Sequence, residues 1–409
     1  MQVASLVLSA LLLILSAARP AHAQAETVLY NFCSQPNCAD GDSPHYQLAS
    51  DGAGNFYGTT FEGGQEYGVG YGTVFELSPN GSGGWNETVL YTFKGGKDGA
   101  NPSSGVIFDS AGNLYGTTYY GGSKGNCVVF ELSPVKKGWK ETVLYRFSGT
   151  DGANPANGLI LDPKGNLYGT TLNIIVGGDL IVFELSPSEG LWTEQMIYSV
   201  NPDVVGLPNG LTMDGDGSIF GTTNFTVFEL SPDGSGGWNP TLIHIFADGP
   251  KDGAYALGTL ALDQAGSLYG VTELGGAHGE QFGGYGTVYK LTHTKKGRKE
   301  RILYSFKGGT KDGLGPVAGI VFDATGNIYG TTSGGGQFNV GTVFELVARV
   351  GKGGYQEKIL WSFNETDGSE PFGSLVLDTA GNLYGVTPSG GTSGCTDDSG
   401  CGVVFEVTP

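Results

Sequence analysis

The stretch Gly-Asn-Leu-Tyr-Gly-Thr-Thr at residues 112–118 decides the fold, because copies of its first five positions recur along the chain. The seven copies run Gly54 to Gly58, Gly112 to Gly116, Gly165 to Gly169, Gly217 to Gly221, Gly266 to Gly270, Gly326 to Gly330 and Gly381 to Gly385. Their final glycines lie 49 to 60 residues apart. That period is typical of one four-stranded propeller blade. The sequence therefore predicts an all-β, seven-bladed β-propeller.

Four strands, A to D, can be assigned within one repeat. In the second repeat they are expected at 103–108, 114–118, 128–132 and 141–147. Pro102 suits the start of strand A because it has no N–H to donate to a neighbouring strand. The tight turn between strands A and B contains Asp109, which can accept backbone N–H groups, and Gly112, which tolerates a positive φ.

The two ends of the chain predict how the ring closes. Strand D follows strand C in the first six repeats, but the seventh repeat stops after strand C at Pro409. A matching strand D stands at the other end, at 26–32, before the first strand A. We expect this N-terminal strand to complete the blade formed by 371–409. Such closure removes two unpaired sheet edges.

The first residues indicate export. An apolar run from Leu6 to Ala18 precedes the small-residue site Ala21-His22-Ala23. This pattern predicts a signal peptide at 1–23, cleaved to leave a single domain at 24–409. No later segment is long and apolar enough to enter a membrane. We expect a secreted or periplasmic monomer.

Composition narrows the class of protein further. Glycine accounts for 73 of 409 residues, without the three-residue period of collagen, and 39% of the residues are hydrophobic. These values fit a folded chain with many strands and turns. The formal net charge of −19 argues against nucleic-acid partners, because phosphates would be repelled.

Three phrases carry a family resemblance: residues 112–118, Gly-Thr-Val-Phe-Glu-Leu at 341–346, and Glu-Thr-Val-Leu-Tyr at 141–145. With them the chain resembles the Gloeo/Verruco (GloVer) tandem-repeat family of exported bacterial proteins. The resemblance extends over nearly all of residues 24–409. It implies a propeller, but it implies neither an activity nor any catalytic residue.

The loops from B to C and from D to the next A should lie on one face, since consecutive strands reverse direction. The D–A loops repeat an Asp-Gly pair, with Asp98, Asp151, Asp252, Asp312 and Asp367 as its aspartates. One interpretation is a ring of cation ligands, with Ca²⁺ as the ion, because hard cations bind carboxylates. The other is a turn motif repeated with the blade.

The B–C loops differ most between repeats, and binding sites often arise from such loops. Together with the neighbouring D–A loop they supply the candidate ligand-binding residues His45, Glu62, Glu66, Tyr67, His278, Glu280, Tyr285, Asp397 and Asp398. Catalysis is less favoured. The four histidines after residue 23 are well separated in the sequence, and no nucleophile elbow or zinc-protease motif occurs.

Five cysteines should meet an oxidising compartment. Cys33 and Cys38 share one loop and Cys395 and Cys401 another, so two local disulfides are the simplest pairing, and pairing between the loops is the alternative. Cys127 is expected to be a buried free thiol. The tryptophans before strand D are expected to pack the C–D connection against its own blade, with an aromatic ligand platform as the alternative.

These features favour a non-catalytic exported propeller with a binding face for a glycan or a protein, and no cofactor other than the Ca²⁺ considered above. The alternative is a carbohydrate-active hydrolase or lyase that uses acidic residues at the channel mouth.

Overall fold

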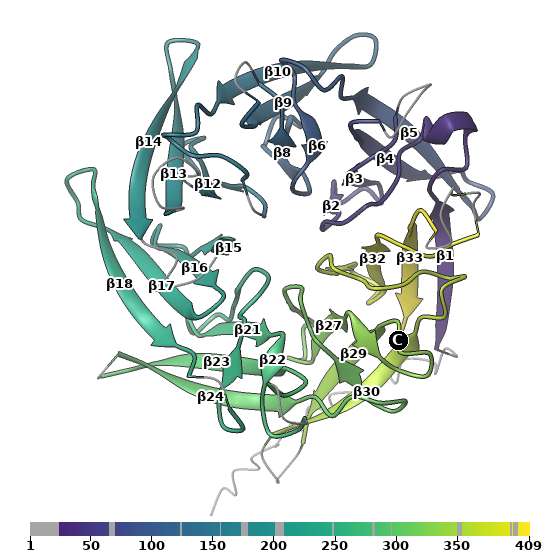
Figure 1. Ribbon diagram of the computed structural model, residues 1–409, viewed down its shortest axis with the longest axis vertical. Helices are drawn as coiled ribbons and strands as arrows, with labels where there is room; N and C mark the ends of the chain where they lie inside the picture. The colour runs from purple at the N-terminus through teal and green to yellow at the C-terminus, as the bar shows by residue number, and fades with distance from the viewer. Residues whose placement is uncertain are drawn as a thin grey trace, which may run out of the picture.

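A computed structural model shows a ring of seven antiparallel sheets with four strands each (Figure 1). It describes residues 24–64, 70–122, 125–155, 157–172, 179–200, 208–247, 249–279, 283–295, 297–349, 354–392, 395 and 400–409. No helix within these ranges is long and apolar enough to span a membrane. The predicted seven-bladed propeller is thus confirmed.

The strands of each blade follow one another from the central channel outward, in the order A to D. Blade 1 contains β2 (Ala49–Ser50), β3 (Phe56–Thr60), β4 (Thr73–Pro79) and β5 (Trp85–Thr92). Blade 2 contains β7 (Ile107–Phe108), β8 (Leu114–Tyr120), β9 (Val128–Pro134) and β10 (Trp139–Arg146), with β6 (Ala100–Pro102) also paired to β8. Blade 3 contains β11 (Ile160–Leu161), β12 (Leu167–Leu172), β13 (Leu180–Ser188) and β14 (Leu191–Val200). Blade 4 contains β15 (Pro208–Met213), β16 (Ile219–Thr223), β17 (Thr226–Pro232) and β18 (Trp238–Ile245).

The remaining three blades repeat this order. Blade 5 contains β20 (Ala261–Leu262), β21 (Leu268–Thr272), β23 (Thr287–Thr294) and β24 (Gly297–Ser305). Blade 6 contains β26 (Val321–Phe322), β27 (Ile328–Thr332), β29 (Thr342–Ala348) and β30 (Tyr355–Ser362). Blade 7 contains β31 (Val376–Leu377), β32 (Leu383–Thr387), β33 (Val403–Thr408) and β1 (Ala25–Asn31). Two short ribbons join loops, β19 (Gly253–Ala254) with β22 (Leu274–Gly275) and β25 (Gly313–Leu314) with β28 (Gly334–Gly335), and a 3₁₀ turn, η1, spans Pro36–Cys38.

The N-terminal strand closes the ring as predicted. β1 pairs antiparallel with β33, from Ala25 opposite Thr408 to Asn31 opposite Val403. In Figure 1 the purple and yellow ends of the chain lie side by side in this blade. β33 is therefore paired on both sides, by β1 and by β32.

The repeated glycine of strand B explains much of the sequence pattern. A Cβ added to Gly116 would lie 2.6 Å from Cζ of Phe130, the buried aromatic of strand C. The same strand-B glycine lies under the strand-C ring in every blade, as Gly58 with Phe75, Gly169 with Phe183, Gly221 with Phe228, Gly270 with Tyr289, Gly330 with Phe344 and Gly385 with Phe405. The glycine thus makes room for the ring that fills the core of the blade.

Strand A is shorter than predicted. In the second repeat only Ile107 and Phe108 form regular pairs with strand B, whereas a strand was expected over 103–108. The segment before them packs on blade 1, because a Cβ at Gly105 would lie 2.2 Å from the carbonyl oxygen of Gln47. Contact between blades around the channel therefore replaces sheet pairing there.

The repeated turn aspartates and tryptophans are structural. Asp109 accepts hydrogen bonds from the N–H groups of Ala111 and Asn113 and so fixes the A–B turn. Trp139 of blade 2 packs against Tyr57 of blade 1, with ring centroids 6.5 Å apart. The tryptophans have the expected packing role, but they contact the preceding blade as well as their own, and so they help to hold neighbouring blades together.

Candidate functional site

A cavity of about 560 Å³ lies in the central channel, where the A segments of all seven blades meet. Most of its wall is aliphatic, with Leu48, Ile107, Leu159 and Leu211 among the lining residues. None of the described residues that line it is Asp, Glu, His, Lys or Arg. This described lining therefore carries no formal charge.

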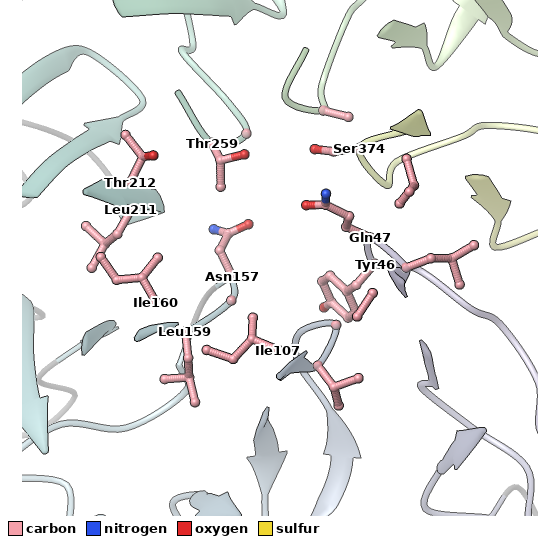
Figure 2. A pocket seen from close by; sticks show the side chains of 18 of the residues that line it. Tyr46, Gln47, Ile107, Asn157, Leu159, Ile160, Leu211, Thr212, Thr259 and Ser374 are labelled. Atoms are coloured by element: carbon pink, nitrogen blue, oxygen red, sulfur yellow. The ribbon is translucent and has the colours of Figure 1, made fainter. Parts of the chain in front are cut away.

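The polar groups of this cavity are amides and hydroxyls. Figure 2 shows the side chains of Gln47, Asn157, Thr259 and Ser374 around the channel, contributed by four different blades. Tyr46 adds a phenol, and burial, with a smaller effect from Tyr119, raises its pKa to about 12. It therefore remains neutral at physiological pH. Such neutral groups can hydrogen-bond to hydroxyls, but they offer no general acid or base that is active near pH 7.

The exposed aromatic side chains of the described residues all lie on one face of the ring. They belong to B–C loops, D–A loops or the end of strand B: Tyr71, Tyr120, Phe225, Tyr255, Phe338 and Phe372. The exposed large aliphatic residues lie instead on outer strands or C–D turns, as Val135 and Leu191 do. Phe372 is 40% exposed and also lines the cavity, so the aromatic face and the channel are continuous there.

The D–A and B–C loops share this face, as expected. Asp42 and Glu62 form an antiparallel bridge in blade 1, and Ser369 and Ser389 do so in blade 7. Blade 4 has the shortest B–C connection, with two residues between β16 and β17. The aromatic pair Phe225 and Tyr255, with ring centroids 5.5 Å apart, lies beside that short connection.

The predicted loop candidates that the structure describes come from different blades. His45 precedes the channel-lining Tyr46; its Nδ1 lies 2.9 Å from the carbonyl oxygen of Ser43, and burial lowers its pKa. Glu62 belongs to the B–C loop of blade 1. His278 and Tyr285 belong to blade 5, where the Tyr285 N–H donates to the carbonyl of His278. Glu66, Tyr67, Glu280, Asp397 and Asp398 lie outside the described residues.

The aspartates of the D–A loops lie at the outer boundaries between blades, here called seams. In the seam between blades 1 and 2, Asp98 accepts hydrogen bonds from the hydroxyl of Tyr91 and the N–H of Lys94. Asp151, Asp252, Asp312 and Asp367 accept comparable bonds, each in its own seam. The structure therefore does not bring these carboxylates together into the proposed ring of cation ligands, and each fixes its own loop.

Each of these aspartates faces a glutamate on strand D of the following blade. Burial and the charge of Asp40 raise the pKa of Glu87 to about 8, and burial and Asp98 raise that of Glu141 to about 7. The buried Oε1 atoms of both glutamates have no hydrogen-bond partner. Strand D of blade 4 has Pro240 in place of the glutamate, and the loop before that blade lacks the Asp-Gly pair. The repeats thus keep or lose the two carboxyl groups together.

The cysteines form the local pairs that the spacing favoured. Cys33 is bonded to Cys38 and Cys395 to Cys401, and Cys127 is a buried free thiol. Sγ of Cys33 lies within 4.8 Å of the sulfurs of Cys395 and Cys401. The two disulfides therefore lie next to each other where blades 7 and 1 meet.

Sequence reasoning missed the residues of the channel cavity. A signal for them exists four residues before the aspartate of each A–B turn. Glycine occupies that position in blades 2, 3, 4 and 6, whereas blades 1, 5 and 7 have Gln47, Thr259 and Ser374. Departures from the repeat consensus thus mark polar groups of the cavity.

Comparison with solved structures supports the fold alone. The chain resembles a protein from Lactobacillus plantarum (13% identity, TM-score 0.55, covering 86% of this chain and 99% of that one). It also resembles a proposed 6-phosphogluconolactonase from Bacteroides fragilis NCTC 9343 (13% identity, TM-score 0.53, 88% and 100% covered). A third similar structure is the extracellular domain of a proposed hybrid two-component system from B. thetaiotaomicron (13% identity, TM-score 0.53, 93% and 41% covered).

Sequence comparison is more specific. No curated protein sequence matches the chain. The model of the Gloeobacter/Verrucomicrobia repeat matches residues 19–226 and 224–409, which together include the whole propeller. The chain, with its seven blades, therefore belongs to the Gloeobacter/Verrucomicrobia repeat family.

Proposed function

We propose that this propeller binds an uncharged glycan on its aromatic loop face and does not cleave it. The observation that supports this most strongly is that the exposed aromatic side chains lie on one face, next to a neutral cavity. Aromatic rings offer apolar surfaces to the C–H faces of sugars, and amide and hydroxyl groups pair with sugar hydroxyls.

Binding without cleavage fits the lining of the cavity. Glycoside hydrolysis generally needs two carboxyl groups beside the bond that is broken. Among the described residues, those that line the cavity include no carboxylate, and the acidic pairs lie in the outer seams. The hydrolase or lyase alternative therefore has less support than binding.

Export belongs to the same proposal. Residues 1–23 have the composition of a signal peptide, and the two disulfides are consistent with an oxidising compartment. N-terminal sequencing of the product that reaches the medium or periplasm should start at Gln24.

A glycan array followed by calorimetry tests the binding. Phe372→Ala and Gln47→Ala should each weaken a glycan hit by about tenfold, which corresponds to about 1.4 kcal/mol, because they remove a stacking surface and an amide. Val135→Ala is the matched control, since Val135 is exposed on a C–D turn away from the loop face.

The outcomes are distinct. Equal binding by Phe372→Ala and the unmodified chain would contradict the placement of the site. Release of new reducing ends from the bound glycan would contradict the non-catalytic part and support the hydrolase alternative.

A further inference from the structure

The seam between blades 4 and 5 brings together three side chains of metal-binding types. His244 lies on β18 of blade 4, Asp252 follows in the loop after it, and Glu300 lies on β24 of blade 5. One ligand atom of each lies within 4.8 Å of those of the other two. Among the described residues, the other groups of this kind include cysteines that are already in disulfides.

A comparison with the other seams of the same chain shows what is special here. At the position of His244, five other strands D have a Tyr or Trp that donates a hydrogen bond to the loop aspartate: Tyr30, Tyr91, Tyr145, Tyr304 and Trp361. A neutral imidazole differs from these groups because one ring nitrogen has a free lone pair. The seam of blades 4 and 5 thus has a nitrogen ligand where the others have an O–H or N–H donor.

The spacing of the histidine and the aspartate fits a shared ion. Nε2 of His244 lies 3.5 Å from Oδ1 of Asp252, which is long for a hydrogen bond. Two ligands that each lie about 2.0–2.1 Å from a tetrahedral zinc ion are roughly 3.4 Å apart. Both side chains are about four-fifths buried, at 19% and 18% exposure. The pair is therefore held at ligand spacing in a site largely shielded from solvent.

This seam also has a carboxyl oxygen available for a ligand. The N–H groups of Ala247 and Gly253 fix the Asp252 carboxylate, and the buried Oε1 of Glu300 has no hydrogen-bond partner. Among the described residues, no Lys or Arg forms an ion pair with either carboxylate. In the next seam, by contrast, Nζ of Lys307 lies 3.2 Å from Oδ2 of Asp312.

We propose that His244, Asp252 and Glu300 bind a divalent transition-metal ion, with Zn²⁺ as the best match. One imidazole and two carboxylates form a mixed nitrogen and oxygen set, which suits Zn²⁺ better than the all-oxygen sites of Ca²⁺ or Mg²⁺. The ion links the outer strand of blade 4, which has Pro240 in place of the seam glutamate, to the outer strand of blade 5. Three protein ligands leave a fourth position for water.

Metal titration of the untagged, chelator-treated chain tests this inference. Calorimetry with Zn²⁺ should give one site per chain, and the thermal midpoint should rise with Zn²⁺ more than with the same concentration of Ca²⁺ or Mg²⁺. His244→Tyr should abolish both effects. This variant should fold, because it restores the residue of the other seams.

Tyr145→His supplies the matched gain of function. It places an imidazole beside Asp151, opposite Glu194 of blade 3, and should raise the stoichiometry from one Zn²⁺ to two. Absence of Zn²⁺ binding, or unchanged binding by folded His244→Tyr, would overturn the inference. A folded Tyr145→His variant with one site would overturn it too, because the imidazole would then not be the deciding ligand.

Discussion

Replacement of Glu87 by Gln should stabilise the propeller at alkaline pH and have little effect at acidic pH. Glu87 of blade 1 faces Asp40, which accepts hydrogen bonds from the Tyr30 hydroxyl and the Ser34 N–H. The pKa of Glu87 rises from an ordinary 4.5 to about 8, so the folded chain favours its protonated form. This contribution to stability is fully present below pH 4.5 and is lost as the pH rises through 8.

The size of the effect follows from that pKa. A rise from 4.5 to about 8 would correspond to at most roughly 5 kcal/mol. Glu87 is only partly buried, and solvent screening reduces the expected difference to about 1–2 kcal/mol. Glutamine keeps the volume of the side chain but cannot ionise. The Glu87→Gln variant should therefore be about 1–2 kcal/mol more stable than the unmodified chain at pH 8.5 and almost equally stable at pH 4.5.

Urea unfolding followed by tryptophan fluorescence measures this difference, because urea, unlike guanidinium, does not screen charges. The free energy of unfolding is determined at both pH values for the unmodified chain, for Glu87→Gln and for Thr88→Ser, an exposed neighbour on β5 that alters no titrating group. The control should change stability equally at both pH values. If Glu87→Gln also changes the free energy of unfolding equally at both pH values, the ionisation of Glu87 does not affect stability, and the reasoning is refuted.

Three further predictions concern the framework. Gly116→Ala should lower the free energy of unfolding by about 1–3 kcal/mol through its clash with Phe130, whereas Gly215→Ala, where the added Cβ meets nothing within 4 Å, should have little effect; urea titration of the two variants checks this. Deletion of residues 24–31 should expose the edge of β33 and cause self-association, visible in light scattering, and an added peptide of that sequence should reverse it. Reduction of the two disulfides should cost about 2 kcal/mol each, seen as an earlier urea midpoint with reductant, because each closes a short loop.

The fold could be predicted from the sequence because its information is local and repeated. Each blade contains the strand-B glycine, a turn aspartate and an alternating strand D, and the displaced strand at 26–32 specifies closure. The length of strand A could not be predicted in the same way. The first half of strand A packs against the neighbouring blade instead of pairing with strand B. Its position depends on contacts between blades, such as the close approach of Gly105 to the Gln47 carbonyl.

The candidate site was less predictable, since it depends on which blades face one another across the channel. Loop length and acidic composition directed attention to Glu62 and His278, which the fold places in different blades. The polar groups of the cavity and His244 differ from the other repeats at single positions. Such differences are visible in the sequence, but their chemistry appears only when the neighbouring blade supplies the partner.

The pairing of β1 with β33 also sets an order of events during biosynthesis. β1 precedes the first six blades in the chain and its partner Val403–Thr408 follows them, so the ring cannot close until the ribosome has made β33. Until then β1 and the growing C-terminal blade both have unpaired strand edges, and an incomplete chain of this kind is prone to aggregate. In an exported chain β1 would pair with β33 only after both strands have crossed the membrane, so ring closure reports that all seven blades have arrived.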